Sequence, residues 1–305
     1  MKVLVTGATG FVGQWLVREL QASGHEAVGS PPSTELDLLD RDAVANLIDR
    51  VRPDAVAHLA GVSYGPDARR DPDRAFSVNV GGTEALAAAM VAASPRAVLL
   101  VAGSSEVYGS PRPEDLPLTE DAPTEPTQPY GLSKLAQERA ALAAADRRAL
   151  SVVVARSFNH TGPGQRGEFV APALARRVLA ARAAGAREIP VGNVDVRRDL
   201  GDVRDVVRAY RLLLEGLAAG AIGSGSIVNV ATGRAVAIRE VLAILSRLAG
   251  VDAEPLVDPA LVRPDDPPEI VGDASRLHAM TGWAPHIGLE RTLADLLDSI
   301  EASAT

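Results

Sequence analysis

The sequence predicts an α/β fold in which a doubly wound parallel sheet is combined with a smaller C-terminal α/β lobe. Three observations indicate this fold. Short apolar runs alternate with helical patterns through the first half of the chain, which is the rhythm of βαβ units. A glycine-rich turn directly follows the first apolar run. The 305 residues, 47% of them hydrophobic, can bury one large core or two modest ones.

The apolar runs of the first half are short enough to be buried strands. We expect strands at residues 2–6, 26–29, 55–59, 97–102 and 151–155. Helical spacing between these runs predicts helices at 12–23, 41–51, 75–93 and 133–145. Parallel strands joined by such helices form one sheet that is covered on both faces.

The second half is richer in proline and looks irregular between its helices. A late apolar strand at 227–231 rejoins the same sheet in our prediction, and helices are expected near 170–184, 203–218, 238–249 and 289–299. We therefore assign residues 1–161 to the large sheet domain, with 199–233 returning to it. Residues 162–198 and 234–305 are assigned to the smaller lobe.

Composition excludes several classes of function. The chain has no cysteine, which removes disulfides, thiolate catalysis and cysteine-ligated metal sites. The five histidines show no paired ligand spacing, so we expect no metal. A net charge of −8 argues against nucleic acid as a partner. We expect no signal peptide and no membrane span, and therefore a cytoplasmic protein.

The turn after the first strand has the glycine spacing of a phosphate-binding loop. Gly7 permits a tight turn, Gly10 lets backbone N–H groups approach a pyrophosphate, and Gly13 allows close packing of the helix that follows. The N-terminus of that helix then faces the anion. The loop predicts a Rossmann-type dinucleotide site, whose further contacts are expected from Thr9, Phe11 and Val12.

The end of the second strand is where such a site distinguishes NAD from NADP. An acidic side chain there binds the ribose 2′-OH and repels a 2′-phosphate. This chain has Ser30 at that place, with neither an acid nor an arginine beside it. We therefore favour NADP(H) over NAD(H). Asp37 and Leu38 are expected to border the adenine, although Asp37 also suits a helix entry.

Tyr130 and Lys134 stand four residues apart at the start of a predicted helix, which places both on one face. An ammonium there lowers the pKa of a phenol and can hold a ribose hydroxyl. Upstream, Ser104 follows a buried strand, and ligands of parallel sheets bind beyond the carboxyl ends of strands. Ser104 can donate a hydrogen bond to a carbonyl oxygen while Tyr130 transfers a proton to it, as the reduction of a ketone requires.

These motifs together resemble the extended short-chain dehydrogenase/reductase family of nucleotide-sugar enzymes. The resemblance rests on the glycine loop, on residues 58–61, 79–83 and 104–109, and on the Tyr130–Lys134 pair. It covers nearly the whole chain. Residues 158–165 and 192–205 most resemble the branch of the family that dehydrates GDP-mannose and reduces the product at C4.

The resemblance implies roles for individual residues. Tyr130 is the acid/base, Lys134 its electrostatic partner and ribose ligand, and Ser104 the carbonyl-binding hydroxyl. The cofactor also contacts Leu59, Ala60, Gly61, Asn79 and Phe158. The substrate contacts Ser105, Glu106 and Asn159, while Arg198 and Arg263 bind its diphosphate. Both arginines also suit surface ion pairs, with Asp199 or Asp265 as neighbours.

The implied activity is the NAD(P)H-dependent reduction of the C4 ketone of a GDP-4-dehydro-6-deoxy-hexose to GDP-D-rhamnose. Glu106 stands where dehydratases of the family carry a catalytic glutamate, so a 4,6-dehydratase remains an alternative. A 4-epimerase using the same residues, and a non-catalytic nucleotide sensor, are the others. The family also implies a homodimer through a four-helix bundle, although small residues on the helices concerned suit packing on their own sheet equally well.

Overall fold

The computed structural model describes residues 1–147, 150–262 and 266–303. Its main sheet has six parallel strands in the order β2-β1-β3-β4-β5-β9. They are β1 (Lys2–Thr6), β2 (Glu26–Gly29), β3 (Ala55–His58), β4 (Val98–Ser104), β5 (Ser151–Ser157) and β9 (Ser226–Val230). This confirms the predicted α/β class with a parallel sheet and the late strand that rejoins it.

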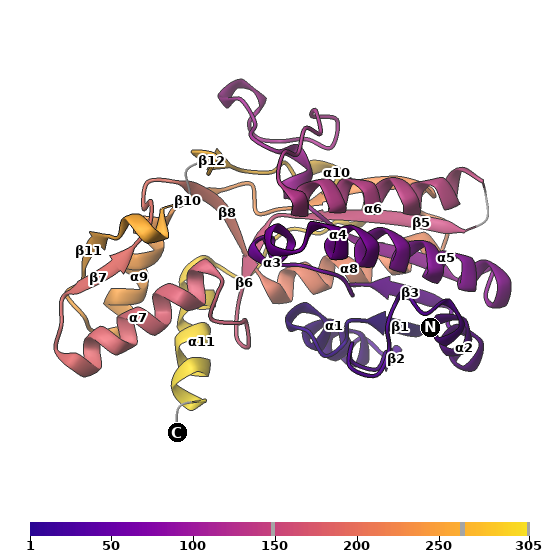
Figure 1. Cartoon of the computed structure of the whole chain (residues 1–305), viewed down its shortest axis with the longest axis horizontal. Coiled ribbons are helices and arrows are strands. Elements are labelled where there is room, and N and C mark those ends of the chain that lie inside the picture. The colour runs from indigo at the N-terminus through magenta and orange to yellow at the C-terminus, as the bar shows by residue number, and fades with distance from the viewer. Residues whose placement is uncertain (148–149, 263–265, 304–305) are drawn as a thin grey trace.

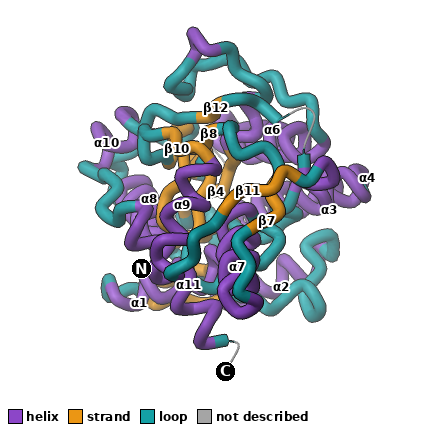
Figure 2. Tube along the Cα trace, turned by 90° about the vertical axis from the view of Figure 1, so that its left-hand side faces the viewer, coloured by secondary structure: helices purple, strands orange, loops and turns teal. Residues whose placement is uncertain are grey.

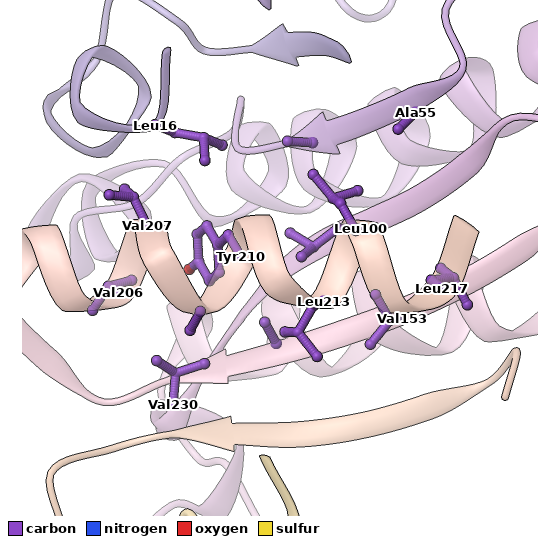
Figure 3. Packing of buried hydrophobic residues seen from close by; sticks show 14 of the residues in the cluster. Leu16, Ala55, Leu100, Val153, Val206, Val207, Tyr210, Leu213, Leu217 and Val230 are labelled. Carbon is purple, nitrogen blue, oxygen red and sulfur yellow. The ribbon is translucent and has the colours of Figure 1, made fainter. Parts of the chain in front are cut away.

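Helices cover both faces of the sheet (Figure 1). Those on one face are α1 (Phe11–Ala22) and α8 (Val203–Ala218), and those on the other are α2 (Arg41–Val51), α5 (Gly82–Ala93) and α6 (Pro129–Asp146). Strand residues alternate between the two faces, so Val3 and Val5 pack under α1 and α8 while Leu4 packs under α2. Figure 3 shows Val207, Tyr210 and Leu213 of α8 lying against the sheet.

The strand order places the functional edge of the sheet. Strand β2 lies on one side of β1 and β3 on the other, so the chain reverses its direction of winding between β1 and β3. In open parallel sheets a ligand binds at such a switch point, outside the carboxyl ends of the strands. The ends of β1, β3, β4 and β5 all lie at this edge.

A long helical stretch crosses the second face of the sheet. After α3 (Gly65–Arg70), the helix α4 (Pro72–Phe76) continues through one π-helical turn, η1 (Ser77–Gly81), into α5. This helical stretch therefore begins at Pro72, a few residues before the predicted start at residue 75. By length and composition alone Pro72–Ala93 could cross a membrane, but half of its most apolar window is buried and it packs against α2 and α6. These are the surroundings of a core helix.

The smaller lobe has its own hydrophobic core, and Figure 2 shows its helices in front of the main sheet. Its helices are α7 (Val170–Ala184), α9 (Ile238–Ala249) and α11 (Leu289–Ala302). The region predicted to be irregular holds short strands, namely β6 (Asn159–Thr161), β7 (Glu188–Val191), β8 (Arg197–Asp202), β10 (Ala235–Ala237), β11 (Glu254–Val257) and β12 (Glu269–Ile270). Strand β8 pairs with β6, β10 and β12, so residues 199–202 lie in this second sheet rather than the first.

Between Ser104 and Tyr130 the chain makes an excursion, drawn in purple at the top of Figure 1. It includes the 3₁₀ turns η2 (Ser105–Tyr108) and η3 (Pro113–Asp115), and returns along Leu118, which bridges to Gly272. The remaining short helices are η4 (Pro259–Leu261) and α10 (Ser275–Thr281).

The buried guanidinium of Arg156 on β5 fixes the base of this excursion. It forms two hydrogen bonds with the carboxylate of Glu138 on α6 and also donates to the Tyr108 hydroxyl and the Glu120 carbonyl. One side chain therefore joins β5, α6 and the loop that follows Ser104.

Candidate active site

The glycine loop has the geometry of a backbone anion cradle. Gly7 has φ +72°, a left-handed conformation that disfavours a side chain. A Cβ on Gly13 would stand 2.1 Å from the Gly7 carbonyl oxygen, so the helix can begin this close to the loop only with glycine there. Gly10 is the N-cap of α1 and offers no side chain to the first N–H groups of the helix. These N–H groups at the start of α1 are therefore available to bind an anion.

Ser30 closes the back of this loop. Its hydroxyl accepts a hydrogen bond from the Gly7 N–H, at 3.3 Å, and donates to the Pro31 carbonyl. Asp37 is exposed and accepts from the Leu39 N–H, as a turn residue does. Leu38 is buried and lies against Gly82 at the start of α5.

The loop after β3 faces the glycine loop and is held by Asn79. The amide of Asn79 accepts from the Val62 N–H at 2.8 Å and donates to the Val62 carbonyl and to Ser133 on α6. A Cβ on Gly61 would stand 2.5 Å from the Asn79 Oδ1. The Ala60 N–H donates to Thr6 at the end of β1. Asn79 is fully buried, so in this structure it shapes the wall of the predicted cofactor site.

Ser104 and Tyr130 meet at the carboxyl end of β4. Ser104 is the last residue of β4, and Tyr130 lies in the first turn of α6, which packs on the turn that follows Ser104. Burial raises the pKa of the Tyr130 phenol well above its ordinary value, and the charge of Glu106 raises it further, while the nearby Ser104 hydroxyl opposes them. The phenol is therefore protonated at neutral pH and can act as a proton donor.

Lys134 lies one turn further along α6, and its ammonium reaches the end of β4. It donates to the Ala102 carbonyl at 2.5 Å and to the side chain of Gln137 at 2.5 Å. Burial lowers the pKa of Lys134 to about 8, against the opposing charge of Glu138. The sequence analysis did not single out Gln137, although its position three residues after Lys134 on a helix puts the two on one face.

The loop after β4 brings Ser105 and Glu106 to the same place. Ser105 is buried, whereas Glu106 is exposed and its N–H donates to the Ser104 hydroxyl. Gly131 of α6 approaches this turn so closely that a Cβ there would stand 2.5 Å from the Glu106 carbonyl oxygen. The start of α6 is thus packed directly on the loop that carries Glu106.

The segment after β5 leads from the main sheet to the smaller lobe. Phe158 is buried against Tyr108 and Gly272, while Asn159 is exposed on β6. The ring of His160 stacks on Phe11 of the glycine loop, with centroids 6.2 Å apart. Burial lowers the pKa of His160, which favours the neutral ring.

Arg198 does not pair with its sequence neighbour Asp199. Its guanidinium pairs with Asp266 at 2.6 Å and donates to the Pro267 carbonyl. Asp199 instead accepts four hydrogen bonds, two from Thr232 and one each from the N–H groups of Gly233 and Gly272. Arg263 and Asp265 lie outside the described residues. In the part of the chain that is described, no group of three or more His, Asp or Glu side chains could hold a metal ion.

With this geometry established, comparison with known proteins identifies the family. A model of the NAD dependent epimerase/dehydratase family matches residues 3–231. The chain belongs to this family. Its membership confirms the predicted resemblance and makes the chain an NAD(P)-dependent enzyme of nucleotide-sugar metabolism.

Full-length relatives of this family include both reductases and epimerases. GDP-6-deoxy-D-mannose reductase from Pseudomonas aeruginosa is 38% identical over 303 residues, which cover 99% of this chain and 97% of the relative. UDP-glucose 4-epimerase from Azospirillum brasilense is 31% identical over 332 residues, which cover 99% and 90%.

Solved structures agree with the fold. The structure of RMD from Pseudomonas aeruginosa complexed with NADPH has a TM-score of 0.90 and 36% identity, covering 99% of both chains. UDP-glucose 4-epimerase from Thermus thermophilus in complex with NAD has a TM-score of 0.85 and 29% identity, covering 99% of this chain and all of the other. These neighbours share the doubly wound parallel sheet.

Proposed function

We propose that this enzyme reduces the C4 ketone of GDP-4-dehydro-6-deoxy-D-mannose to GDP-D-rhamnose. The observation that carries the proposal is the phenol of Tyr130, which lies beside Ser104 at the end of β4 and one helical turn from the Lys134 ammonium. This group can donate a proton to a carbonyl oxygen at neutral pH. The likeness to GDP-6-deoxy-D-mannose reductase supports the choice of sugar.

The residues of the cradle fit a dinucleotide. The N-terminus of α1, Gly7 and Gly10 would hold the pyrophosphate, together with Thr9, Phe11 and Val12. We propose NADP(H) as the preferred cofactor, because the end of β2 carries Ser30 where a carboxylate would repel a 2′-phosphate. The NADPH bound by RMD supports this preference. We further propose cofactor contacts from Leu59, Ala60, Gly61, Phe158, Asp37 and Leu38, as predicted from the sequence.

When bound, the reduced nicotinamide supplies a hydride to C4. The Ser104 hydroxyl donates a hydrogen bond to the carbonyl oxygen and stabilises the negative charge that develops there. Tyr130 transfers its phenolic proton to the same oxygen, giving the C4 hydroxyl, and the phenolate regains a proton from solvent. Lys134 stabilises the phenolate by its positive charge and binds a ribose hydroxyl of the cofactor.

We propose that the smaller lobe, residues 162–198 and 234–305, binds the GDP part of the substrate, with residues 1–161 as the cofactor domain. The separate hydrophobic core of the smaller lobe supports this division. Asn159 and Ser105 contact the sugar, and Arg198 and Arg263 bind the diphosphate. A phosphate oxygen would then replace Asp266 as the partner of Arg198. Arg198→Ala should chiefly raise the KM for the nucleotide sugar, and an unchanged KM would contradict this assignment.

A 4,6-dehydratase is the second candidate, because Glu106 lies in η2, the turn after Ser104 against which the start of α6 packs beside Tyr130. A carboxylate in that position can remove water after oxidation at C4. A 4-epimerase or a nucleotide sensor on the same scaffold would be further alternatives.

A panel of nucleotide sugars separates these functions. GDP-4-dehydro-6-deoxy-D-mannose, its dTDP and UDP counterparts, GDP-mannose and UDP-glucose are each incubated with NADPH or NADH, and the product is identified by NMR. We expect oxidation of NADPH with the GDP ketone and an equatorial C4 hydroxyl. Activity with the dTDP or UDP ketone only would overturn the choice of nucleotide. Dehydration of GDP-mannose would establish the dehydratase, and no turnover of any sugar would favour the sensor.

We also propose a cytoplasmic homodimer in which α5 and α6 of two copies form a four-helix bundle, without a membrane or nucleic-acid partner. Val91 on α5 and Leu132 on α6 are 40% and 42% exposed, which is unusual for large apolar side chains on neighbouring helices. Phe76 on α4 is exposed in the same stretch. Light scattering should give twice the chain mass for the wild type and a lower mass for Leu132→Glu. A monomeric wild type would contradict the dimer.

A further inference from the structure

The ammonium of Lys134 has little freedom in the structure. An ammonium has three N–H donors. Two of them are used by the protein, one on the Ala102 carbonyl and one on the Gln137 Oε1. The first acceptor belongs to the backbone of β4 and the second to a side chain on the same helix as Lys134. Together they fix the direction of the third N–H.

Gln137 is itself oriented by a buried chain of hydrogen bonds. Its amide Nε2 donates to the Thr83 hydroxyl at 3.0 Å, and Gln137 is only 1% exposed. The Thr83 hydroxyl donates its single proton to the backbone carbonyl of Asn79, at 2.7 Å, so it can only accept from Gln137. The amide nitrogen of Gln137 must therefore face Thr83, and its carbonyl oxygen must face Lys134.

The same hydroxyl also meets His58. The His58 Nε2 lies 3.0 Å from the Thr83 hydroxyl, and its Nδ1 lies 2.8 Å from Thr6. Since Thr83 has no proton left to give, His58 donates to it from Nε2 and accepts from Thr6. Burial, with a smaller effect of Lys134, lowers the pKa of His58 to about 3, so the ring stays neutral. The chain from Thr6 to Lys134 therefore contains no second cation.

The amide of Gln137 carries no charge, so it leaves the positive charge of Lys134 uncancelled. The charged and titratable groups that interact with Lys134 are Glu138 on α6 and His58 on β3, and Tyr130 lies one turn before it on α6, where Glu106 acts on the phenol. Glu138 is already paired with Arg156. Gln137 thus gives the ammonium a partner that orients it without neutralising it.

We propose that Gln137 is a positioning residue for the reduction: held by Thr83, it aims the remaining N–H of Lys134 at the cofactor ribose beside Tyr130. The inference rests on the proposed function, since it assigns Lys134 to the cofactor. It does not depend on which sugar is the substrate.

The test compares Gln137→Met, which has similar volume and no comparable acceptor, with the wild type. NADPH binding is followed by fluorescence titration, and ketone reduction by kcat, KM and their pH dependence. We expect a 3- to 10-fold higher Kd for NADPH and a kcat about 10- to 100-fold lower. The KM for the sugar should stay within about 2-fold. The alkaline limb of the kcat profile should move to lower pH, because the ammonium loses an acceptor.

Controls separate positioning from folding. Gln21→Met changes an exposed glutamine on α1 and should match the wild type in all these measurements. Thr83→Val removes the acceptor that orients Gln137 and should reproduce part of the defect, while Thr83→Ser keeps the hydroxyl and should restore it. The double variant Thr83→Val/Gln137→Met should be no worse than Gln137→Met, since both act through one chain. Thermal unfolding of each variant shows whether the fold is retained.

Binding of NADPH makes the inference testable without turnover. If a folded Gln137→Met binds NADPH as the wild type does and shows the same pH profile, Gln137 only fills space and the proposal is wrong. If the wild type binds NADPH but reduces none of the sugars tested, the proposed function fails, and the Kd comparison still decides the role of Gln137.

Discussion

Ser104 at the end of β4 lies close enough to Tyr130, in the first turn of α6, for its hydroxyl to lower the pKa of the phenol. The contact depends on two features around it. Gly131 lets α6 begin against the Glu106 carbonyl, and Arg156 clamps α6 to the loop that follows Ser104. The residues proposed as proton donor and ketone-binding hydroxyl are thereby held in one place by the fold itself.

Tyr130→Phe should remove this proton donor and leave the cofactor cradle intact. We expect kcat to fall by about 10²- to 10⁴-fold, because a positioned general acid contributes that much. The Kd for NADPH, measured by fluorescence titration, should change by less than about 3-fold. Undiminished ketone reduction would rule out Tyr130 as the acid.

Lys134→Arg should cripple hydride transfer although the charge is kept. A planar guanidinium cannot satisfy both Ala102 and Gln137 from the position of a compact ammonium in a buried site. We expect kcat to fall by at least about 100-fold, with weaker NADPH binding. Lys2→Arg, at the amino end of β1, is the matched control and should be silent. Near-normal turnover of Lys134→Arg would show that only the charge matters.

Gly13→Ala should damage the cofactor site through the backbone. The added methyl would stand 2.1 Å from the Gly7 carbonyl oxygen, so α1 or the loop must move. We expect at least about a 10-fold rise in the Kd for NADPH, together with a lower melting temperature. Gly223→Ala, whose nearest neighbour would be 4.0 Å away, is the control. Equal NADPH affinity in both variants would contradict the cradle.

Arg156→Met should destabilise the fold strongly. It leaves the carboxylate of Glu138, which is only 3% exposed, without its partner, and the loss of one member of a buried pair costs about 3–5 kcal/mol. Adding Glu138→Leu should recover part of that free energy of unfolding. Chemical denaturation of the single and double variants measures it, and equal stability of the two would argue against an uncompensated charge.

His58 should make the protein sensitive to mild acid. The pKa of His58 is about 3 in the folded chain against an ordinary value of 6.5, so the unfolded state binds the proton first. Stability should therefore fall as the pH drops from 6.5 towards 3. His58→Gln removes this titration, and its free energy of unfolding should fall less over the same range. Parallel curves for the two proteins would assign the acid sensitivity to other groups.

Local patterns in the sequence predicted much of the fold and of the candidate site. The glycine spacing, the alternation of strands and helices, and the Tyr130–Lys134 pair are each encoded within a few residues. The short strands of the smaller lobe carry no such signal, because β6, β10 and β12 have three residues or fewer. They form only by pairing with β8.

Local sequence patterns also could not predict the contacts between distant parts of the chain. The pairing of Arg198 with Asp266 joins β8 to the segment before β12, which is far from it in sequence, and a nearer acid suggested another partner. The chain from Thr6 through His58, Thr83 and Gln137 to Lys134 joins four separate elements. Of its links, only that between Gln137 and Lys134 could have been found from helical spacing.

The pairing of β9 with β5 affects how the chain folds during synthesis and where it can be cut into fragments. Strand β9 and helix α8 arrive only after β6, α7, β7 and β8 have been synthesised. A fragment that ends at residue 161 would therefore leave the edge of β5 unpaired and the apolar side chains of Leu100 and Val153, which α8 covers, open to water. A nascent chain passes through that state on the ribosome. Replacing the smaller lobe of this enzyme with one from another protein would require two junctions, one on either side of α8 and β9.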